Sequence, residues 1–523
     1  MIITELQQLY AAHPNVEGMY RLLQDNSVRH LYCSGLCASA ASLFSSVLIQ
    51  RVECPFVFIL GDLEEAGYFY HDLTQILGTE QVLFFPSSFR RAIKYGQKDA
   101  ANEILRTEVL SRLQKGEEGL CVVTYPDALA EKVVSRKELG DKTLKLHLGE
   151  KVDMDFVTEV LRSYSFEYVD YVYEPGQYAV RGSIIDVFSF SSEFPFRIDF
   201  FGDEVESIRT FEVESQLSKE KKENIVIVPD LSHSLEQRGN GGMVSFLDFL
   251  QPDTLLAMKD FLWLRERIQT VHDEALTAQA IAAREAEENG LISLDGKLID
   301  GGEFTLRALD FRRIEFGTKP TETPDATVTF NTTAQPIFHK NFDLVAESFH
   351  DYLSRNYALY ICSDSLKQTE RIRAIFEDRG DNISFTSVER TLHEGFADDA
   401  LRLCIFTDHQ LFDRFHKYNL KSDKARSGKV ALSLKELNQF TPGDYVVHTD
   451  HGVGRFTGLV RIPNGDTTQE VMRLVYQNDD VVFVSIHSLH KVSKYKGKEG
   501  EAPRLNKLGT GAWEKLKDRT KTK

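Results

Sequence analysis

The feature that most constrains the fold is a regular alternation of short apolar runs with helical patterns between residues 54 and 125. Stretches with helical periodicity at 64–77 and 97–114 separate the apolar runs 54–60, 81–85 and 119–124. Buried strands that alternate with helices are typical of βαβ units, whose strands form a parallel sheet. We therefore predict an α/β domain in this part of the chain.

A different pattern begins near residue 165, where apolar and polar residues alternate between turns rich in Gly and Asp. The alternation is clearest at 178–188 and 196–201, and it predicts a mostly antiparallel sheet. Helical patterns return at 243–250 and 264–289. The antiparallel part is therefore predicted to be an insert, after which the first α/β domain resumes.

Two smaller units are predicted beyond the insert. Helical patterns at 342–357 and 365–376 alternate with apolar runs at 358–362 and 401–406, which indicates a second α/β domain without recognisable chemistry. After a polar linker, short strands and turns from 442 to about 492 are typical of a small β-barrel. The predicted fold class is therefore multidomain α/β and β.

The overall charge argues against autonomous DNA binding. The chain has 523 residues, 62 of them Lys or Arg and 79 Asp or Glu, with a formal net charge of −17. Binding to DNA phosphates requires a broad basic surface. The segment 491–523 is the exception, with eleven Lys or Arg against four Asp or Glu. We interpret it as a solvated end, and contact with nucleic acid is the alternative.

Cysteine usage and the N-terminal residues predict a cytoplasmic location. The six cysteines are scattered without a C-x-x-C pair, which is typical of a reducing compartment. The first residues do not form a basic region followed by an apolar one, and no run approaches the 18 or so apolar residues that span a bilayer. We therefore expect no membrane partner.

Residues 35–42 have the spacing of a phosphate-binding P-loop, G-x-x-x-x-G-K-[ST]. Gly35 and Ser42 are present, but Ala40 replaces the second Gly and Ala41 replaces the Lys. Without the Lys nothing neutralises the phosphates, and the methyl group of Ala40 obstructs their approach to the backbone. The loop is either a non-functional remnant of a nucleotide site or a helix start made of small residues.

Two other motifs indicate no chemistry. Residues 203–206 resemble a metal-binding D-E-x-x motif but lie within the antiparallel insert, where a solvated turn is the better interpretation. His448 and His451 suggest a metal cluster, yet a tight turn adjoins them and no third ligand stands at a recognisable spacing. We predict neither catalytic residues nor a metal site.

Three segments together resemble a known family. Residues 30–330 resemble UvrB in a degenerate form, on the broken loop at 35–42 and on the stretches 178–188 and 196–209, which are similar to its UvrA-binding domain. Residues 442–456, with 488–495, look like a CarD-type domain that binds RNA polymerase. A UvrB-like part followed by a CarD-type module is the arrangement of the transcription-repair coupling factor (Mfd) family, whose N-terminal part this chain resembles.

The resemblance implies a division into domains. It assigns a UvrB-like domain 1a at 1–125, an inserted UvrA-binding domain 2 at 126–217, a UvrB-like domain 1b at 218–335, a variable α/β domain 3 at 336–425, a linker at 426–440, a CarD-type domain at 441–505 and the start of a further linker at 506–523.

The resemblance also implies a function in transcription-coupled nucleotide excision repair. A full-length member binds RNA polymerase stalled at a lesion, displaces it by ATP-dependent translocation on double-stranded DNA, and recruits UvrA. Its motor domains, which use ATP and Mg, would follow Lys523. This chain would supply both docking surfaces, bind no cofactor and be catalytically inactive.

Arg181, Arg197 and Phe201 match the residues with which the family contacts UvrA. If Arg197 follows Phe196 in a strand, the two side chains lie on opposite faces, so the arginine can stay solvated. Exposed arginines and an aromatic ring are typical of binding hot spots. The alternative is a structural ion pair of Arg197 with an aspartate, either Asp199 or Asp203.

The segment Val471, Met472, Arg473 and Leu474 is predicted to bind the β subunit of RNA polymerase. Within 471–476, alternation places Met472, Leu474 and Tyr476 on one face. As an edge strand, the segment would offer unpaired backbone groups to a partner strand. The alternative is an interior strand whose apolar residues all belong to the core.

Two other functions remain open. A UvrB-type damage-binding protein would need the P-loop Lys and a long aromatic hairpin, and we find neither in the sequence. A CarD-like transcription regulator, with the UvrB-like part as a scaffold, would bind polymerase without binding UvrA.

Overall fold

The computed structural model describes most of the chain, in two compact units that are treated separately. Unit 1 consists of Met1–Lys145, Phe190–Ser192 and Val226–Leu420, and unit 2 of Leu146–Ser189, Glu193–Ile225 and Lys421–Lys523. The described residues are 1–89, 100–213, 216–231, 243–285, 297–414, 416, 418, 442–448, 450–464, 467–485, 492–495, 503 and 505–508. The predicted linker at 426–440 lies outside them, as does most of the basic segment 491–523.

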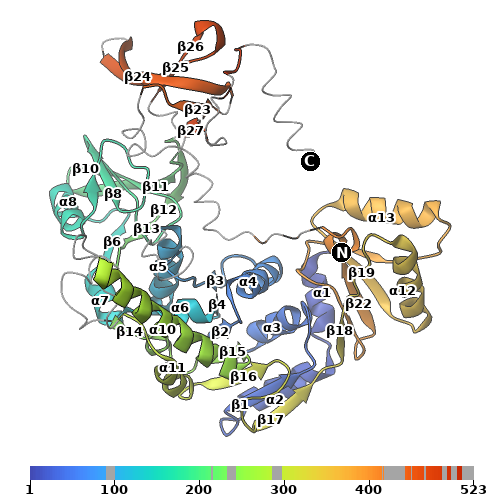
Figure 1. Ribbon diagram of the computed structural model, residues 1–523. Coiled ribbons are helices and arrows are strands. Elements are labelled where there is room, and N and C mark those ends of the chain that lie inside the picture. Colours follow the sequence, from blue (N-terminus) through green and yellow to red (C-terminus); the bar gives the residue numbers. More distant parts are fainter. Residues whose placement is uncertain are drawn as a thin grey trace. The chain divides into compact units, whose positions relative to one another are not determined.

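A seven-stranded sheet forms the centre of unit 1, with every pairing parallel, in the order β17-β1-β16-β15-β2-β4-β3 (Figure 1). Its strands β15 and β16 follow the insert in sequence yet pair with strands that precede it, as predicted. The strands are β1 His30–Ser34, β2 Phe56–Ile59, β3 Val82–Phe84, β4 Cys121–Thr124, β15 Leu255–Lys259, β16 Arg312–Phe316 and β17 Ala326–Thr329.

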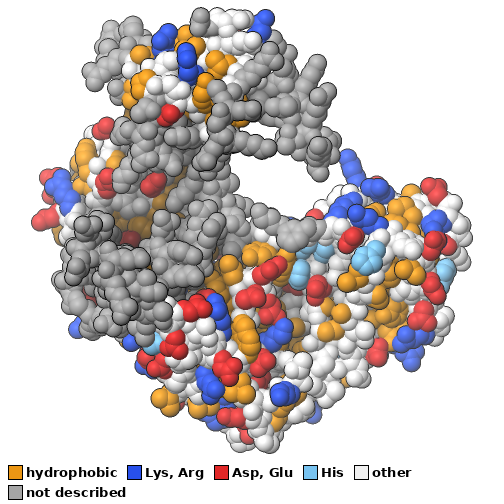
Figure 2. Space-filling view, in the orientation of Figure 1, with side chains coloured by type: hydrophobic (Ala, Val, Ile, Leu, Met, Phe, Trp, Pro, Cys, Tyr) orange, Lys and Arg blue, Asp and Glu red, His pale blue; other side chains and the backbone are white. Residues whose placement is uncertain are grey.

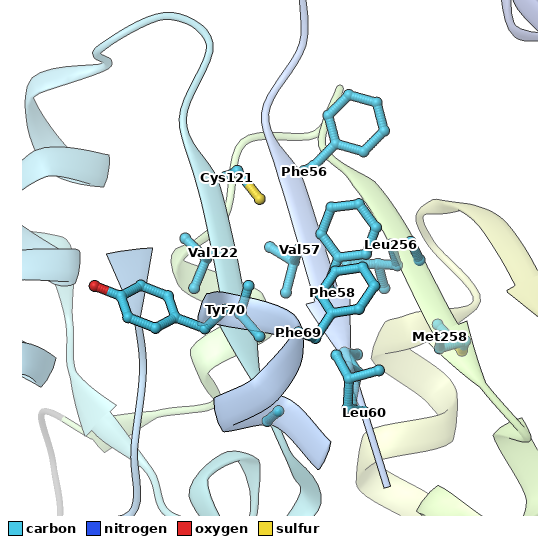
Figure 3. Packing of buried hydrophobic residues seen from close by; sticks show 14 of the residues in the cluster. Phe56, Val57, Phe58, Leu60, Phe69, Tyr70, Cys121, Val122, Leu256 and Met258 are labelled. Atoms are coloured by element: carbon cyan, nitrogen blue, oxygen red, sulfur yellow. The ribbon is translucent and has the colours of Figure 1, made fainter. Parts of the chain in front are cut away.

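The central strands read as continuous apolar runs because both faces of the sheet are covered by helices. Figure 3 shows Phe56 and Phe58 of β2 side by side, with Phe69 of α4 packed against Phe58 at a ring-centroid distance of 5.0 Å. The helices of this part are α1 Ile3–Tyr10, α2 Pro14–Gln24, α3 Ala40–Arg51, α4 Leu63–Leu77, α5 Ala100–Lys115, α6 Pro126–Leu129, α7 Arg136–Asp141, α10 Phe261–Glu285 and α11 Gly301–Ala308.

The helical pattern predicted at 243–250 is wrong. The segment forms a short strand, β14 Met243–Val244, which pairs with β5 Val133–Val134, and a 3-10 helix, η2 Phe246–Phe249. Ser245 caps the 3-10 helix by accepting from the Leu247 N–H at 3.3 Å. Phe246 and Phe249 are buried, so their spacing reflects a short buried turn rather than an α-helix.

A second, mixed sheet in unit 1 has the order β18-β21-β22-β19-β20. The helices and strands predicted between 342 and 406 are present in it, with β19 parallel to both of its neighbours and β21 antiparallel to both of its own. Its elements are β18 Thr332–Ala334, α12 Phe342–Ser354, β19 Ala358–Ser363, α13 Leu366–Asp378, β20 Thr386–Glu389, β21 Phe396–Asp398, β22 Leu403–Thr407 and α14 Asp408–Leu411.

A six-stranded sheet forms the insert, in the order β12-β11-β10-β9-β8-β7. Four of its pairings are antiparallel and only β7–β8 is parallel, as the alternation predicts. Asp203 lies exposed in the turn before β11, so residues 203–206 are a hairpin turn and the beginning of a strand. The elements are β6 Leu144–His147, α8 Met154–Ser163, β7 Glu167–Tyr168, β8 Gln177–Arg181, β9 Ile184–Val187, β10 Phe196–Phe201, β11 Glu204–Phe211, β12 Ser218–Lys222 and β13 Asn224–Ile227.

The module after residue 442 is a five-stranded antiparallel sheet in the order β26-β25-β24-β23-β27. Strand β25 lies between β24 and β26, so the prediction of an edge strand at 471–476 is wrong. The strands are β23 Tyr445–His448, β24 Gly452–Asn464, β25 Thr467–Val475, β26 Val481–Ser485 and β27 Val492–Lys494, with a 3-10 turn, η4 Gln477–Asp479, between β25 and β26.

The described ranges contain neither a metal-binding cluster nor a membrane-spanning helix. There, no group of three or more His, Cys, Asp or Glu could hold a metal ion. His448 and His451 stack with ring centroids 4.6 Å apart. No described helix is both long and apolar enough to cross a membrane.

Candidate docking sites

One buried carboxylate on the insert sheet binds two arginines from neighbouring strands. Asp186 of β9 is fully buried and pairs in register with Arg197 of β10. Arg197 donates from Nε to Oδ1 at 2.8 Å and from Nη2 to Oδ2 at 2.9 Å. Arg181, at the end of β8, donates to the same Oδ2. The three charged groups therefore keep a net positive charge at this point of the sheet.

Both arginines are also held by aromatic rings. The guanidinium of Arg197 lies 4.4 Å from the ring centroid of Phe211, and that of Arg181 lies 5.0 Å from the centroid of Tyr171. The hydrogen bond with Asp186 raises the pKa of Arg197 even though burial opposes its charge. The planar guanidinium of Arg197, fixed by two hydrogen bonds to Asp186 and by a ring, has little orientational freedom left to lose on binding, and that of Arg181 is held by one hydrogen bond and a ring.

Phe201 ends β10 on the same face as Arg197. Along this strand Phe196, Ile198 and Phe200 are buried, whereas Phe201 is 77% exposed. The predicted separation of Arg197 from Phe196 and Ile198 is therefore confirmed. Phe201 is a large apolar side chain that the insert leaves in solvent.

The predicted structural partners of Arg197, Asp199 or Asp203, are both wrong. The arginine pairs with Asp186, and its side chain is only 14% exposed, so it is not solvated as expected. Asp199 instead accepts from Arg209 and from Ser207. The available signal was a single acidic residue in the otherwise apolar strand 184–187. A charged residue in such a run is usually paired when it is buried.

The cationic row continues towards the edge of the sheet. Arg197 is in register with Arg209 of β11, which is in register with Lys221 of β12. All residues of β12 are exposed, and β12 is the last strand in the pairing order of this sheet. The insert therefore presents a basic row within a chain whose net charge is −17.

The broken phosphate loop connects β1 to α3. Gly35 has φ +79°, and a Cβ at this position would lie 2.0 Å from the Phe330 carbonyl oxygen, so only glycine fits. Ala40 begins α3 and is fully buried, and Ala41 lines a small hollow with apolar side chains such as Phe44 and Phe316. Ser42 Oγ donates to Asp72 Oδ2 at 2.8 Å.

Residues of the second sheet bind the loop directly. The Glu394 N–H donates to Ser39 Oγ at 3.0 Å. The Cys37 N–H donates to Thr332 Oγ1 at 3.0 Å, and that hydroxyl donates to the Gly35 carbonyl oxygen at 2.6 Å. The Cys37 N–H and the Ser39 hydroxyl, polar groups of the kind that bind a phosphate in an intact P-loop, are here hydrogen-bonded within the protein.

The four residues predicted to bind polymerase do not share one surface. Val471, Met472 and Leu474 are buried. Arg473 is partly exposed and in register with Phe483 of β26, which is 50% exposed. Within the described part of this sheet, β26 is an end strand. The exposed edge of the module therefore carries Phe483, with Arg473 beside it.

Comparison with known proteins identifies both modules. The UvrB interaction domain family matches residues 144–233, and the CarD-like/TRCF RID domain family matches residues 440–496. A transcription-repair-coupling factor of Bacillus subtilis (strain 168) is 23% identical over 94% of this chain and 47% of its own length. This chain is similar to transcription-repair-coupling factors over more than nine tenths of its length.

Other transcription-repair-coupling factors agree with that relationship. Those of Staphylococcus aureus strains bovine RF122 / ET3-1 and USA300 are each 24% identical over 92% of this chain and 47% of their own length. The chain thus spans about half the length of the curated relatives it matches. The resemblance is confirmed, since the UvrB interaction domain match includes residues 178–188 and 196–209 and the CarD-like/TRCF RID match includes residues 442–456.

Proposed function

We propose that this chain is the partner-docking part of a transcription-repair-coupling factor that acts in transcription-coupled nucleotide excision repair. The observation that carries the proposal is the presence of a UvrB interaction domain and a CarD-like/TRCF RID domain in one chain. One module recruits UvrA and the other binds RNA polymerase stalled at a lesion. The whole protein displaces the polymerase by ATP-dependent translocation on double-stranded DNA.

UvrA docks on the insert through Arg181, Arg197 and Phe201. Support comes from the shared face of Arg197 and Phe201 and from the fixed orientation of both guanidinium groups on Asp186. Preorganised arginines on the same face of the sheet as an exposed aromatic ring suit a partner surface that has carboxylates around an apolar pocket. Arg209 and Lys221 extend the same basic row.

The second module binds the β subunit of RNA polymerase by strand addition to β26 rather than to β25. An edge strand offers unpaired N–H and C=O groups, and its outward side chains supply specificity. Phe483 is half exposed on this strand, and Arg473 is its cross-strand neighbour. Val471, Met472 and Leu474 contribute by holding β25 in place beneath the edge.

The chain itself is catalytically inactive and needs no cofactor. ATP and Mg bind to the motor domains of the whole protein, which also contact double-stranded DNA. Support comes from Ala40 and Ala41 in the loop and from the hydrogen bonds that the second sheet makes to it. A UvrB-type damage-binding function finds no support in these features.

A pull-down with purified UvrA and, separately, with RNA polymerase tests the proposal. A coupling factor binds both partners, whereas a CarD-like transcription regulator binds the polymerase alone. Variants in the two modules should separate the activities, because Phe201→Ala affects only UvrA binding and Phe483→Glu affects only polymerase binding. If the wild-type chain binds polymerase but not UvrA, the result supports the CarD-like regulator instead.

A further inference from the structure

His71 of α4 meets three histidines that lie more than 300 residues later in the chain, where α4 contacts the second sheet of unit 1. The His416 ring centroid lies 4.3 Å from that of His409, 5.0 Å from that of His71 and 6.0 Å from that of His393. In the space-filling view, pale-blue histidine side chains gather between the regions of α4 and α13 (Figure 2). We call these four residues the histidine seam.

The seam is part of the contact that binds the second sheet to the phosphate loop. The ring of Tyr68, on α4, stacks on His393 with centroids 3.5 Å apart, and its hydroxyl donates to the His416 carbonyl oxygen at 2.7 Å. The His393 N–H donates to Asp72 Oδ1 at 2.7 Å. The next residue, Glu394, reaches the loop through Ser39. Separation of the seam would therefore break the hydrogen bonds from His393 to Asp72 and from Glu394 to Ser39.

Hydrogen bonding indicates neutral imidazoles. His409 Nε2 lies 2.7 Å from the His393 carbonyl oxygen, which can only accept, so this nitrogen carries the proton. Within the described residues, His71 Nε2, His393 Nδ1 and His416 Nδ1 have no hydrogen-bond partner. A second proton on these rings would add an unpaired donor and a charge to a cluster in which His71 and His409 are buried and His393 and His416 are partly buried, which is costly.

Burial and mutual repulsion act in the same direction on all four rings. Burial, with smaller contributions from neighbouring histidines, lowers the pKa of His71 and His416 to about 4 and that of His393 to about 3. Burial also lowers the pKa of His409. In a separated state each ring would return towards the ordinary histidine pKa of about 6.5 and bind a proton in mild acid.

Carboxyl groups around the seam oppose this effect only in part. Burial raises the pKa of Asp72 to about 7, and it also raises the pKa values of Glu394 and Asp408. These groups take up protons in the closed state, which acid therefore favours. Asp364 faces the seam and raises the pKa values of His71, His409 and His416. Arg414 faces Asp408 and lowers its pKa. In acid the closed state can gain at most three protons, on these three carboxyl groups, whereas the separated state gains four, on the histidines. Acid therefore favours separation on balance.

We propose that the histidine seam is an acid-sensitive latch, which holds the second sheet on the phosphate loop while its four imidazoles are neutral and loosens when they are protonated. The histidines decide in which direction pH acts. They stabilise the contact fully above the ordinary histidine pKa, and this stabilisation is lost as the pH falls towards their lowered pKa values in the closed state. Loosening withdraws His393 from Asp72 and Glu394 from Ser39. The loop between β1 and α3 becomes accessible without unfolding of the seven-stranded sheet.

Hydrogen exchange on the full chain tests the latch. Exchange of peptides covering 391–395 and 37–39, corrected for intrinsic pH dependence against a peptide covering β4, is compared at about pH 7.5 and about pH 5.5, which bracket the ordinary histidine pKa. Acidification should raise the corrected exchange of both peptides about tenfold. The double variant His71→Phe/His416→Phe keeps aromatic rings but removes two titrating groups, so its increase should be several times smaller.

The matched control is His350→Phe, because His350 is an exposed histidine on α12 outside the seam. Its acid response should equal that of the wild type. An unchanged exchange pattern at the lower pH, or an equal acid response in the double variant, overturns the latch. Should the double variant not fold, NMR titration of histidine rings in the wild-type chain decides. Ordinary pKa values for all four histidines contradict the proposal, and lowered values with exchange beginning on protonation support it.

Discussion

Arg197 and Asp186 form a two-point ion pair across β10 and β9, with both carboxylate oxygens accepting from one guanidinium. The carboxylate is fully buried and also binds Arg181. Removing its charge leaves two arginines without their counterion, which is more damaging than the loss of one surface pair.

We therefore expect Asp186→Asn to destabilise the insert and to weaken UvrA binding together. The free energy of unfolding should fall by about 2–3 kcal/mol, less than for a fully buried pair because Arg181 is partly exposed. Urea unfolding and UvrA affinity measure the two effects. Asp199→Asn is the control, since Asp199 pairs with Arg209 and should affect UvrA affinity less. Equal effects of both substitutions would contradict a special role for Asp186.

Phe201→Ala should separate binding from stability. The side chain is mostly exposed, so its removal should change the free energy of unfolding by less than about 0.5 kcal/mol. UvrA affinity should fall at least about tenfold if the ring fills a pocket on the partner. Leu217→Ala removes another exposed apolar side chain of the insert and should leave affinity unchanged. Surface plasmon resonance with immobilised UvrA compares the three proteins, and wild-type affinity for Phe201→Ala would exclude this residue from the interface.

The two faces of the last module should respond oppositely to charge. Leu474→Arg places a charge in the core formed with Phe456 and Tyr476, so the module should unfold. Phe483→Glu changes an exposed edge position and should keep the melting temperature while abolishing polymerase binding. Differential scanning calorimetry and a polymerase pull-down on the same samples give both readouts. Full polymerase binding by Phe483→Glu would remove β26 as the docking edge.

Restoring the P-loop signature should not restore nucleotide binding. Ala40→Gly with Ala41→Lys recreates the residue types, but the loop still bonds to Thr332 and Glu394, and the Lys would enter an apolar hollow. We expect lower stability and no ATP binding by calorimetry at up to millimolar nucleotide. The single variant Ala41→Ser, which adds no cation, serves as control for stability. Tight ATP binding by the double variant would show that only the residue types at 40 and 41 prevent nucleotide binding, and that the hydrogen bonds and packing around the loop do not.

Asp72→Asn should stabilise the chain in a pH-dependent way. Burial raises the pKa of Asp72 to about 7, whereas an unfolded aspartate titrates near 3.8. The free energy of unfolding of the wild-type protein therefore falls as the pH rises from about 4 to about 7, because over this range Asp72 releases its proton readily only in the unfolded state. The amide has no such penalty, so the variant's advantage should grow over this window, by up to about 4 kcal/mol, and stay constant above it. Chemical denaturation at several pH values measures the difference, and a difference independent of pH would contradict it.

Local sequence patterns determined a large part of this protein. Alternation with a period of two depends only on the geometry of a single strand, so it placed Arg197 opposite Phe196 and Met472 on the same face as Leu474. The replacements at Ala40 and Ala41 are likewise visible without a structure. The order of apolar runs and helices sufficed for the parallel sheet, because such runs are buried on both faces.

Only the tertiary structure decided which residues meet. The partner of Arg197 proved to be Asp186 because β9, not the neighbouring turn, lies beside β10. Strand β25 is interior because β26 folds back along it, a fact that alternation within β25 does not record. The histidine seam joins residues more than 300 positions apart, and sequence spacing predicts only local neighbours. Contacts between distant residues depend on how whole helices and strands pack. Tertiary packing therefore determines the ion pairs, the exposed sheet edge and the histidine seam.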